Sequence, residues 1–203
     1  MLLNSRAKFF LIFGSSTISF SYSLTSPILQ IYFISLISAP VLAVSNIITV
    51  GLAALVNSSV PYERIKQMYR DNFIYIVFID VLCFCIVSFL SVEHVVIRFI
   101  GFSILNAVST NIWSIVIRDA VNQVISGDDL TNWSAYYRSY ELWASFIGGI
   151  LAIFLTNISV EICIALQCAA NIIMGAGDIY SYNLLKKEKN SIELEKEGVA
   201  ECH

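Results

Sequence analysis

Long apolar runs, separated by short polar stretches, dominate the pattern along the chain. No charged residue occurs between Phe9 and Tyr62. As one helix this stretch would be roughly 80 Å long at ~1.5 Å per residue, more than twice the ~30 Å hydrocarbon core of a bilayer. It therefore crosses twice, with a break at Ser23–Pro27 or at Ser35–Pro40. We prefer the second break, because the first leaves a short first span. The two predicted spans are then Phe9–Ser35, kinked near Pro27, and Pro40–Val56.

Four further apolar runs follow, each long enough or nearly long enough to cross a bilayer. They are Asn72–Leu90, Val95–Ile117, Glu141–Thr156 (expected to start a few residues earlier) and Ile162–Tyr182. The longest polar connection is Arg118–Glu141. The pattern predicts an all-α, polytopic transmembrane bundle of about six helices over residues 9–185. It follows a short N-terminus, residues 1–8, and precedes a charged tail, residues 186–203, predicted to be a frayed helix or disordered.

Basic residues sort to one side of this arrangement. Eleven of the twelve Lys and Arg residues fall at the two ends of the chain or in the even-numbered connections. The exception is Arg98, just inside the fourth span. By the positive-inside rule, both termini are cytoplasmic and the protein is a multi-pass protein of the cell membrane.

Composition agrees, with 57% hydrophobic and 13% charged residues against roughly 45–50% and 25% in soluble domains. The lipid bilayer is therefore the expected partner, and nucleic acid is not. No catalytic motif such as G-x-S-x-G or H-E-x-x-H occurs, so we expect no enzyme, no cofactor and no metal. Four of the five cysteines lie in apolar runs, where cysteine behaves as a small hydrophobe.

A few polar residues inside the spans are candidates for contact with a substrate or a coupling proton. Asp80 lies near the middle of the third span, where a carboxylate costs roughly +2.5–3.5 kcal/mol. It either binds a proton or substrate, or makes a structural pair with Arg98. Arg98 either reaches the headgroups or faces the interior. Asn106 and Asn111 need hydrogen-bond partners and should face inward.

Charged residues at the inner ends of spans are gating candidates. Arg118 and Asp119 are predicted to pair with neighbours around Arg64 or Arg138, as a cytoplasmic latch. Asp178 is expected to be exposed at the interface, with a gating contact as the alternative.

Two other expectations concern span ends and helix packing. Glu141 and Glu161 mark span ends and are expected to be solvated. Small residues spaced four apart should let helices approach closely. These are Ser15/Ser19/Ser23, Ala39/Ala43, Gly148/Ala152 and Ala165/Ala169.

Residues 8–185 resemble one six-helix half of a major facilitator superfamily transporter. Three passages carry the resemblance: the loop Pro61–Arg70, the segment Val96–Gly101 and the passage Arg118–Ile150, which ends in Ser145-Phe-Ile-Gly-Gly149. The loop lacks the family's usual Gly and Asp-Arg pair, and the Arg-x-x-x-Gly signature is one residue short.

The resemblance implies a secondary transporter that moves a small solute. Members of the family normally have two six-helix halves, with substrate bound between them at the midplane. A single half would act as a homodimer or with a second half. The alternative is a non-transporting immunity, accessory or interaction protein built on a repurposed half.

Overall fold

The computed structural model describes residues 5–36, 70–90, 116–125, 127–155 and 157–200, the side chains as far as Ser191, and single positions between these ranges. Within that part the chain is helical, without a strand, and five helices have defined bounds. These helices are α1 (Ser5–Leu36), α4 (Phe73–Leu90), α6 (Arg118–Val124), α7 (Asp128–Phe154) and α8 (Val160–Ala200). The all-α class is confirmed.

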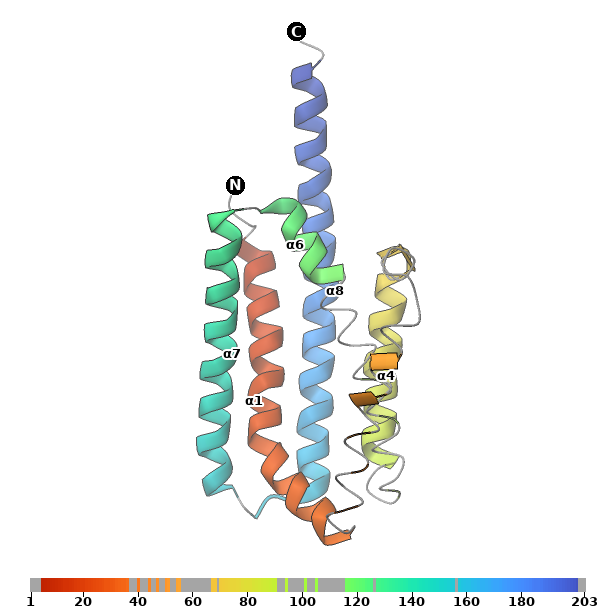
Figure 1. Ribbon diagram of the computed structural model, residues 1–203, viewed down its shortest axis with the longest axis vertical. Coiled ribbons are helices and arrows are strands. Elements are labelled where there is room, and N and C mark those ends of the chain that lie inside the picture. Colours follow the sequence, from red (N-terminus) through yellow and green to blue (C-terminus); the bar gives the residue numbers. More distant parts are fainter. Residues whose placement is uncertain are drawn as a thin grey trace.

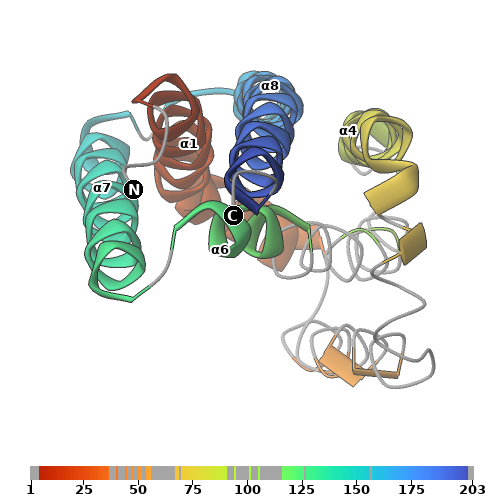
Figure 2. The same ribbon diagram turned by 90° about the horizontal axis from the view of Figure 1, so that it is seen from above.

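The four long helices stand side by side in the order α7, α1, α8, α4 (Figure 2). The short α6 lies across their upper end, against α8 (Figure 1). Helices α1, α4 and α7 all begin at this upper end and run downward, whereas α8 begins at the lower end and returns. The upper end is therefore where three helices start and one continues past the bundle.

Glycines set the closest approaches of α8 to its two neighbours. A Cβ on Gly175 would lie 2.7 Å from a methyl group of Val81 in α4. A Cβ on Gly177 would lie 3.0 Å from the main-chain oxygen of Phe10 in α1. The Gly175-Ala-Gly177 sequence therefore lets α8 pack tightly against helices on both sides, as small residues do between membrane helices.

Buried apolar side chains form two clusters, one towards each end of the bundle. The upper cluster gathers residues of all five helices, among them Leu11, Phe73, Val121, Trp133 and Leu185. The lower cluster includes Leu29, Phe33, Phe84, Ile164 and Cys168. Between the clusters the buried side chains are largely polar.

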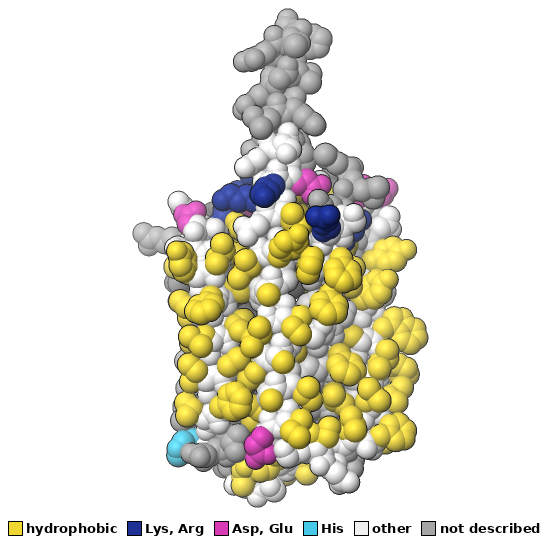
Figure 3. Space-filling model, turned by 180° about the vertical axis from the view of Figure 1, so that it is seen from behind, with side chains coloured by type: hydrophobic (Ala, Val, Ile, Leu, Met, Phe, Trp, Pro, Cys, Tyr) yellow, Lys and Arg dark blue, Asp and Glu magenta, His cyan; other side chains and the backbone are white. Residues whose placement is uncertain are grey.

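Apolar side chains also cover the outside of the molecule. Figure 3 shows them over most of one face, with the Lys and Arg side chains gathered at the upper end. Within the described part of the chain, two helices are long and apolar enough to cross a membrane, α4 and the Val160–Ser191 part of α8. Only 28% of the α4 window is buried. The core helix of a soluble protein would be mostly buried, so these helices favour a membrane location.

Helices α1 and α7 have the length of a span but carry more polar residues. Three polar side chains of α1, Ser15, Ser21 and Thr25, are buried. Pro27 lies inside α1, which continues beyond it to Leu36. The structure thus agrees with the preferred break after Ser35 rather than with the one at Ser23–Pro27.

Two predicted boundaries differ from the structure. The polar connection Arg118–Glu141 contains α6 and the first half of α7, which begins at Asp128. These segments are helical because their few apolar residues recur three or four positions apart, as Leu130, Trp133 and Tyr137 do, and pack into the upper cluster. At the other end of the chain, α8 runs on to Ala200, through most of the predicted tail. The predicted second and fourth spans lie outside the described residues apart from single positions.

Candidate functional site

Polar side chains lie between the two apolar clusters on each of the four long helices. We call this set, Ser15, Asp80, Glu141, Asn171 and Asp178, the polar layer. On α1, α4 and α8, each member lies along its helix between residues of the upper cluster and residues of the lower cluster. On α7, Glu141 lies below the residues that belong to the upper cluster. All but Glu141 are buried, and Glu141 is largely shielded. The layer brings three carboxyl groups into the interior of a bundle with an apolar exterior.

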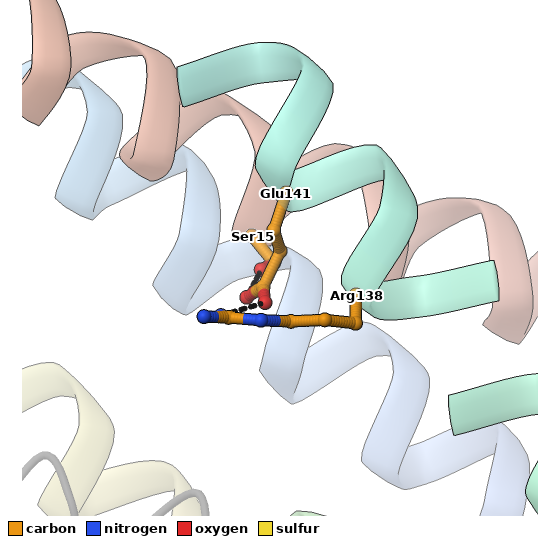
Figure 4. Close-up of polar contacts among 3 residues, drawn as sticks. All are labelled: Ser15, Arg138 and Glu141. Carbon is orange, nitrogen blue, oxygen red and sulfur yellow. Dashed lines mark hydrogen bonds and ion pairs between the residues drawn. The ribbon is translucent and has the colours of Figure 1, made fainter. Parts of the chain in front are cut away.

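The best defined contact in the layer joins α1 to α7 (Figure 4). The hydroxyl of Ser15 donates a hydrogen bond to one carboxylate oxygen of Glu141. The guanidinium of Arg138 donates to the other oxygen at 3.0 Å. The Glu141 side chain is 19% exposed and that of Arg138 is 69% exposed. One oxygen of Glu141 is thus held inside by α1, and the other points to a cation at the surface.

The prediction that Glu141 is solvated is therefore wrong. The residue begins the strongly apolar part of α7, but it lies on the side of the helix that contacts α1. Its neighbour Tyr137 lies near Ser15 and Glu141. Residues of α1 and α7 therefore meet at this point.

Asp178 is buried in α8 with only 2% of its surface exposed. It directly follows Gly177, whose close approach to Phe10 holds α8 against α1. The expectation of interfacial exposure is wrong, because α8 packs against α1 at this level and the Asp178 side chain is buried. The alternative, a gating contact, stays a prediction.

Asp80 is buried in α4 on the side that faces α8. It lies on the same helix face as Val77 and Phe84, which belong to the upper and the lower cluster. The interior placement of this charged group was predicted from its position in the span. Arg98, its predicted partner, lies outside the described residues, as do Asn106 and Asn111.

A second polar contact joins α1 to α8 just below the polar layer, on the side of the lower apolar cluster. The amide nitrogen of Gln167 donates to the hydroxyl of Thr25 at 2.8 Å, and this hydroxyl donates to the main-chain oxygen of Ser21. The side chain of Asn171 donates to the main-chain oxygen of Gln167 at 2.9 Å. Asn171 faces inward, as expected for an asparagine within a span. Gln167, 1% exposed, was missed, although a lone glutamine in an apolar run is a signal of the same kind.

The predicted latch stays a prediction, because one of its members lies outside the described residues. The Arg118 side chain is exposed, and Asp119 accepts a hydrogen bond from Gln123 within α6 at 2.7 Å. Arg138 pairs with Glu141 instead. Arg64 lies outside the described part of the chain.

This arrangement has a defined chemical capacity. Carboxyl, hydroxyl and amide groups in an apolar surrounding can hold a proton or hydrogen-bond a polar solute. Within the described residues no group of three or more His, Cys, Asp or Glu side chains is placed to hold a metal ion.

Comparison with protein-family models, with curated proteins and with solved structures finds no match to this chain.

Proposed function

We propose that the chain is an integral membrane protein with about six crossings that forms one wall of a pathway for a small polar solute. The observation that carries the proposal is the polar layer, which puts Asp80 and Asp178 between the residues of the two apolar clusters and Glu141 below those of the upper cluster. Ionisable groups within membrane spans are costly, and they usually mark substrate paths or proton relays. A bundle that only holds its helices together does not need three such ionisable groups.

The surface supports the membrane part of the proposal. Large apolar side chains are exposed along α1, α4, α7 and α8. Such an area is far larger than the apolar patches that soluble monomers tolerate. The charged side chains at the upper end match the inner headgroup region (Figure 3).

The directions of the helices support six crossings. Helix α1 ends at the lower end of the bundle and α4 begins at the upper end (Figure 1). Likewise, α4 ends below and α6 begins above. The described helices on either side of each of these two intervals thus end and begin at opposite ends of the bundle, which supports the proposal of two crossings in addition to those of α1, α4, α7 and α8.

Six crossings are half of the usual major facilitator architecture, and that architecture places solute between two halves. We therefore propose that the protein works as a homodimer or with a second six-helix half. Asp80 and Asp178 are buried between helices in this structure, so the polar layer would line the solute path only when the helices of the bundle move apart during transport.

Topology is the first test. Reporter fusions after His94 and after Asn157 should report an external location, and fusions after Asn190 a cytoplasmic one. Cytoplasmic activity of the His94 fusion would contradict both the number of crossings and the orientation.

Transport is the second test. Purified protein in proteoliposomes should exchange members of a panel of radiolabelled sugars, amino acids and organic anions. Asp178→Asn and Asp80→Asn should lower the rate at least tenfold for any solute that is moved. Glu161→Gln is the matched control, because this carboxylate is exposed at the lower end of α8. A rate that survives both Asn variants would exclude the polar layer from the pathway.

One observation favours the alternative of a non-transporting interaction protein. Ser15 and Arg138 bind the two carboxylate oxygens of Glu141, and the amide nitrogen of Gln167 binds the hydroxyl of Thr25. A layer built only to lock helices together would have such bonds. In that case the Asn variants would alter stability in detergent without a defect specific to any solute.

A further inference from the structure

A charged cavity lies at the upper end of the bundle, apart from the polar layer. It has a volume of about 280 Å³ and lies between the segment that precedes α4, helix α6 and the upper part of α8. This volume is close to the lower limit of typical small-molecule pockets, ~300 Å³. The cavity is partly open to the outside, so a ligand could enter it without a rearrangement of the bundle.

Three cations line this cavity, and they come from two elements. Lys186 and Lys189 lie on one face of α8, together with Tyr182 and Leu185. Arg70 lies on the opposite wall, and the Tyr182 hydroxyl donates to its main-chain oxygen at 3.5 Å. This contact ties the chain before α4 to α8 and holds Arg70 near the lysines.

Two carboxylates also line the cavity, Asp71 and Asp119, and Asp119 accepts a hydrogen bond from the Gln123 amide at 2.7 Å. Among the described lining residues, three cations and two carboxylates leave a net charge of +1.

The floor of the cavity is apolar. Val116 and Leu185 belong to the upper apolar cluster, and Ala120 packs against it. The cavity thus combines a cationic rim with an apolar base, at the level where α8 leaves the bundle (Figure 1). A phosphate group joined to an apolar body matches both features.

We propose that this cavity binds a phosphate-bearing anion, and specifically the headgroup of an anionic phospholipid of the inner leaflet. The phosphate contacts Arg70 and Lys186, and the glycerol and first acyl carbons lie over Val116, Ala120 and Leu185. This inference rests on the proposed membrane location but not on the solute pathway.

Binding can be measured on the full chain in neutral detergent. Dioleoylphosphatidylglycerol should raise the thermal unfolding midpoint in a concentration-dependent way, since a ligand that binds only the folded state stabilises it. Dioleoylphosphatidylcholine, which has no net charge, should not. Arg70→Gln and Lys186→Gln should each raise the phosphatidylglycerol concentration needed about tenfold, as expected for loss of a hydrogen bond to a charged group.

Lys187→Gln is the matched control, because this lysine adjoins Lys186 but does not line the cavity. It should keep the wild-type response. Lys186→Arg should also keep it, and would show that charge at this position matters rather than packing. Native mass spectrometry of the same variants should show the same order of retained phosphatidylglycerol.

Sodium phosphate distinguishes the two sources of the anion. Stabilisation by sodium phosphate at millimolar concentration, lost in Arg70→Gln and Lys186→Gln, would assign the site to a free phosphate. Equal stabilisation by phosphatidylcholine, or an equal loss in Lys187→Gln, would overturn the proposal. A failed solute assay with an intact phosphatidylglycerol response would reject the transport function alone.

Discussion

Gly148 of α7 lies directly against the main-chain oxygen of Phe20 in α1. A Cβ at this position would be 2.5 Å from that oxygen and 3.2 Å from the side chain of Ser23. The next residue, Gly149, has nothing within 4 Å of its would-be Cβ. One glycine of the pair therefore sets the distance between the two helices, whereas its neighbour does not.

The pair offers a controlled test of this packing. Gly148→Ala should separate α7 from α1 and destabilise the protein by about 1–3 kcal/mol, the usual cost of overpacking. Gly149→Ala should be neutral or slightly stabilising, because alanine is the better helix former. Unfolding in mixed micelles with increasing SDS measures both. Equal effects of the two substitutions would show that α7 does not pack on α1 through Gly148.

The contact of Ser15 with Glu141 leads to a second prediction. Ser15→Ala removes a hydrogen bond to a charged group in a shielded place and should cost about 1.5–3 kcal/mol. Arg138→Gln breaks an ion pair whose cation is exposed and should cost only ~0–1 kcal/mol. The two variants should thus differ clearly in the same SDS titration. A larger loss for Arg138→Gln would mean that the ion pair, rather than the hydroxyl, fixes Glu141.

Hydropathy and charge in the sequence predicted the broad features of the fold. The bounds of α4 agree with the expected span to within one residue, and α1 extends beyond its predicted span by four residues at its start and one at its end. On the face that Figure 3 shows, the Lys and Arg side chains gather at the upper end of the bundle. These features depend on whether lipid or water surrounds each segment, and the amino-acid composition of a segment indicates which of the two it is.

The sequence did not predict which polar groups meet. Ser15 and Glu141 are 126 positions apart, and Thr25 and Gln167 are 142 apart. The side of a helix that faces a neighbour depends on packing. For the same reason, the expectation that Ala165 and Ala169 pack against another helix is wrong, since both are exposed. Gly148 and Ala152 are buried, as expected.

The contribution of the hydrogen bond between Thr25 and Gln167 to stability can be measured with Thr17 as the control residue. Thr25 and Thr17 both donate to the main-chain oxygen four positions earlier at 2.7 Å, but only Thr25 also accepts from Gln167. Thr25→Val should therefore destabilise by ~0.6–1.7 kcal/mol, the range measured for hydrogen bonds between membrane helices. Thr17→Val should have little effect.

A double-mutant cycle completes this test. In the Gln167→Leu background, Thr25→Val should cost much less than in the wild type, because the shared bond is already gone. If the costs of the two substitutions simply add, the side chains are not coupled and α1 and α8 are held together by other contacts.

The packing of α4 against α8 can be tested chemically through two cysteines. Cys85 of α4 and Cys168 of α8 lie near each other where these two helices pack together. Both are free thiols in the structure. Copper phenanthroline should oxidise them to a disulfide in intact membranes if the two helices pack in this way, because a disulfide forms only between cysteines that are close together.

The readout needs a cut between the two helices. A protease site inserted beside Gly127, in the connection between α6 and α7, separates the two cysteines in sequence. After oxidation and cleavage, the chain should run as one band on a non-reducing gel and as two bands after reduction. Cys85→Ser should abolish the single band, and Cys83→Ser should leave it, because these two cysteines point to different sides of α4. Crosslinking that persists in Cys85→Ser would mean that α4 is rotated relative to α8, and Asp80 would then not face the interior of the bundle.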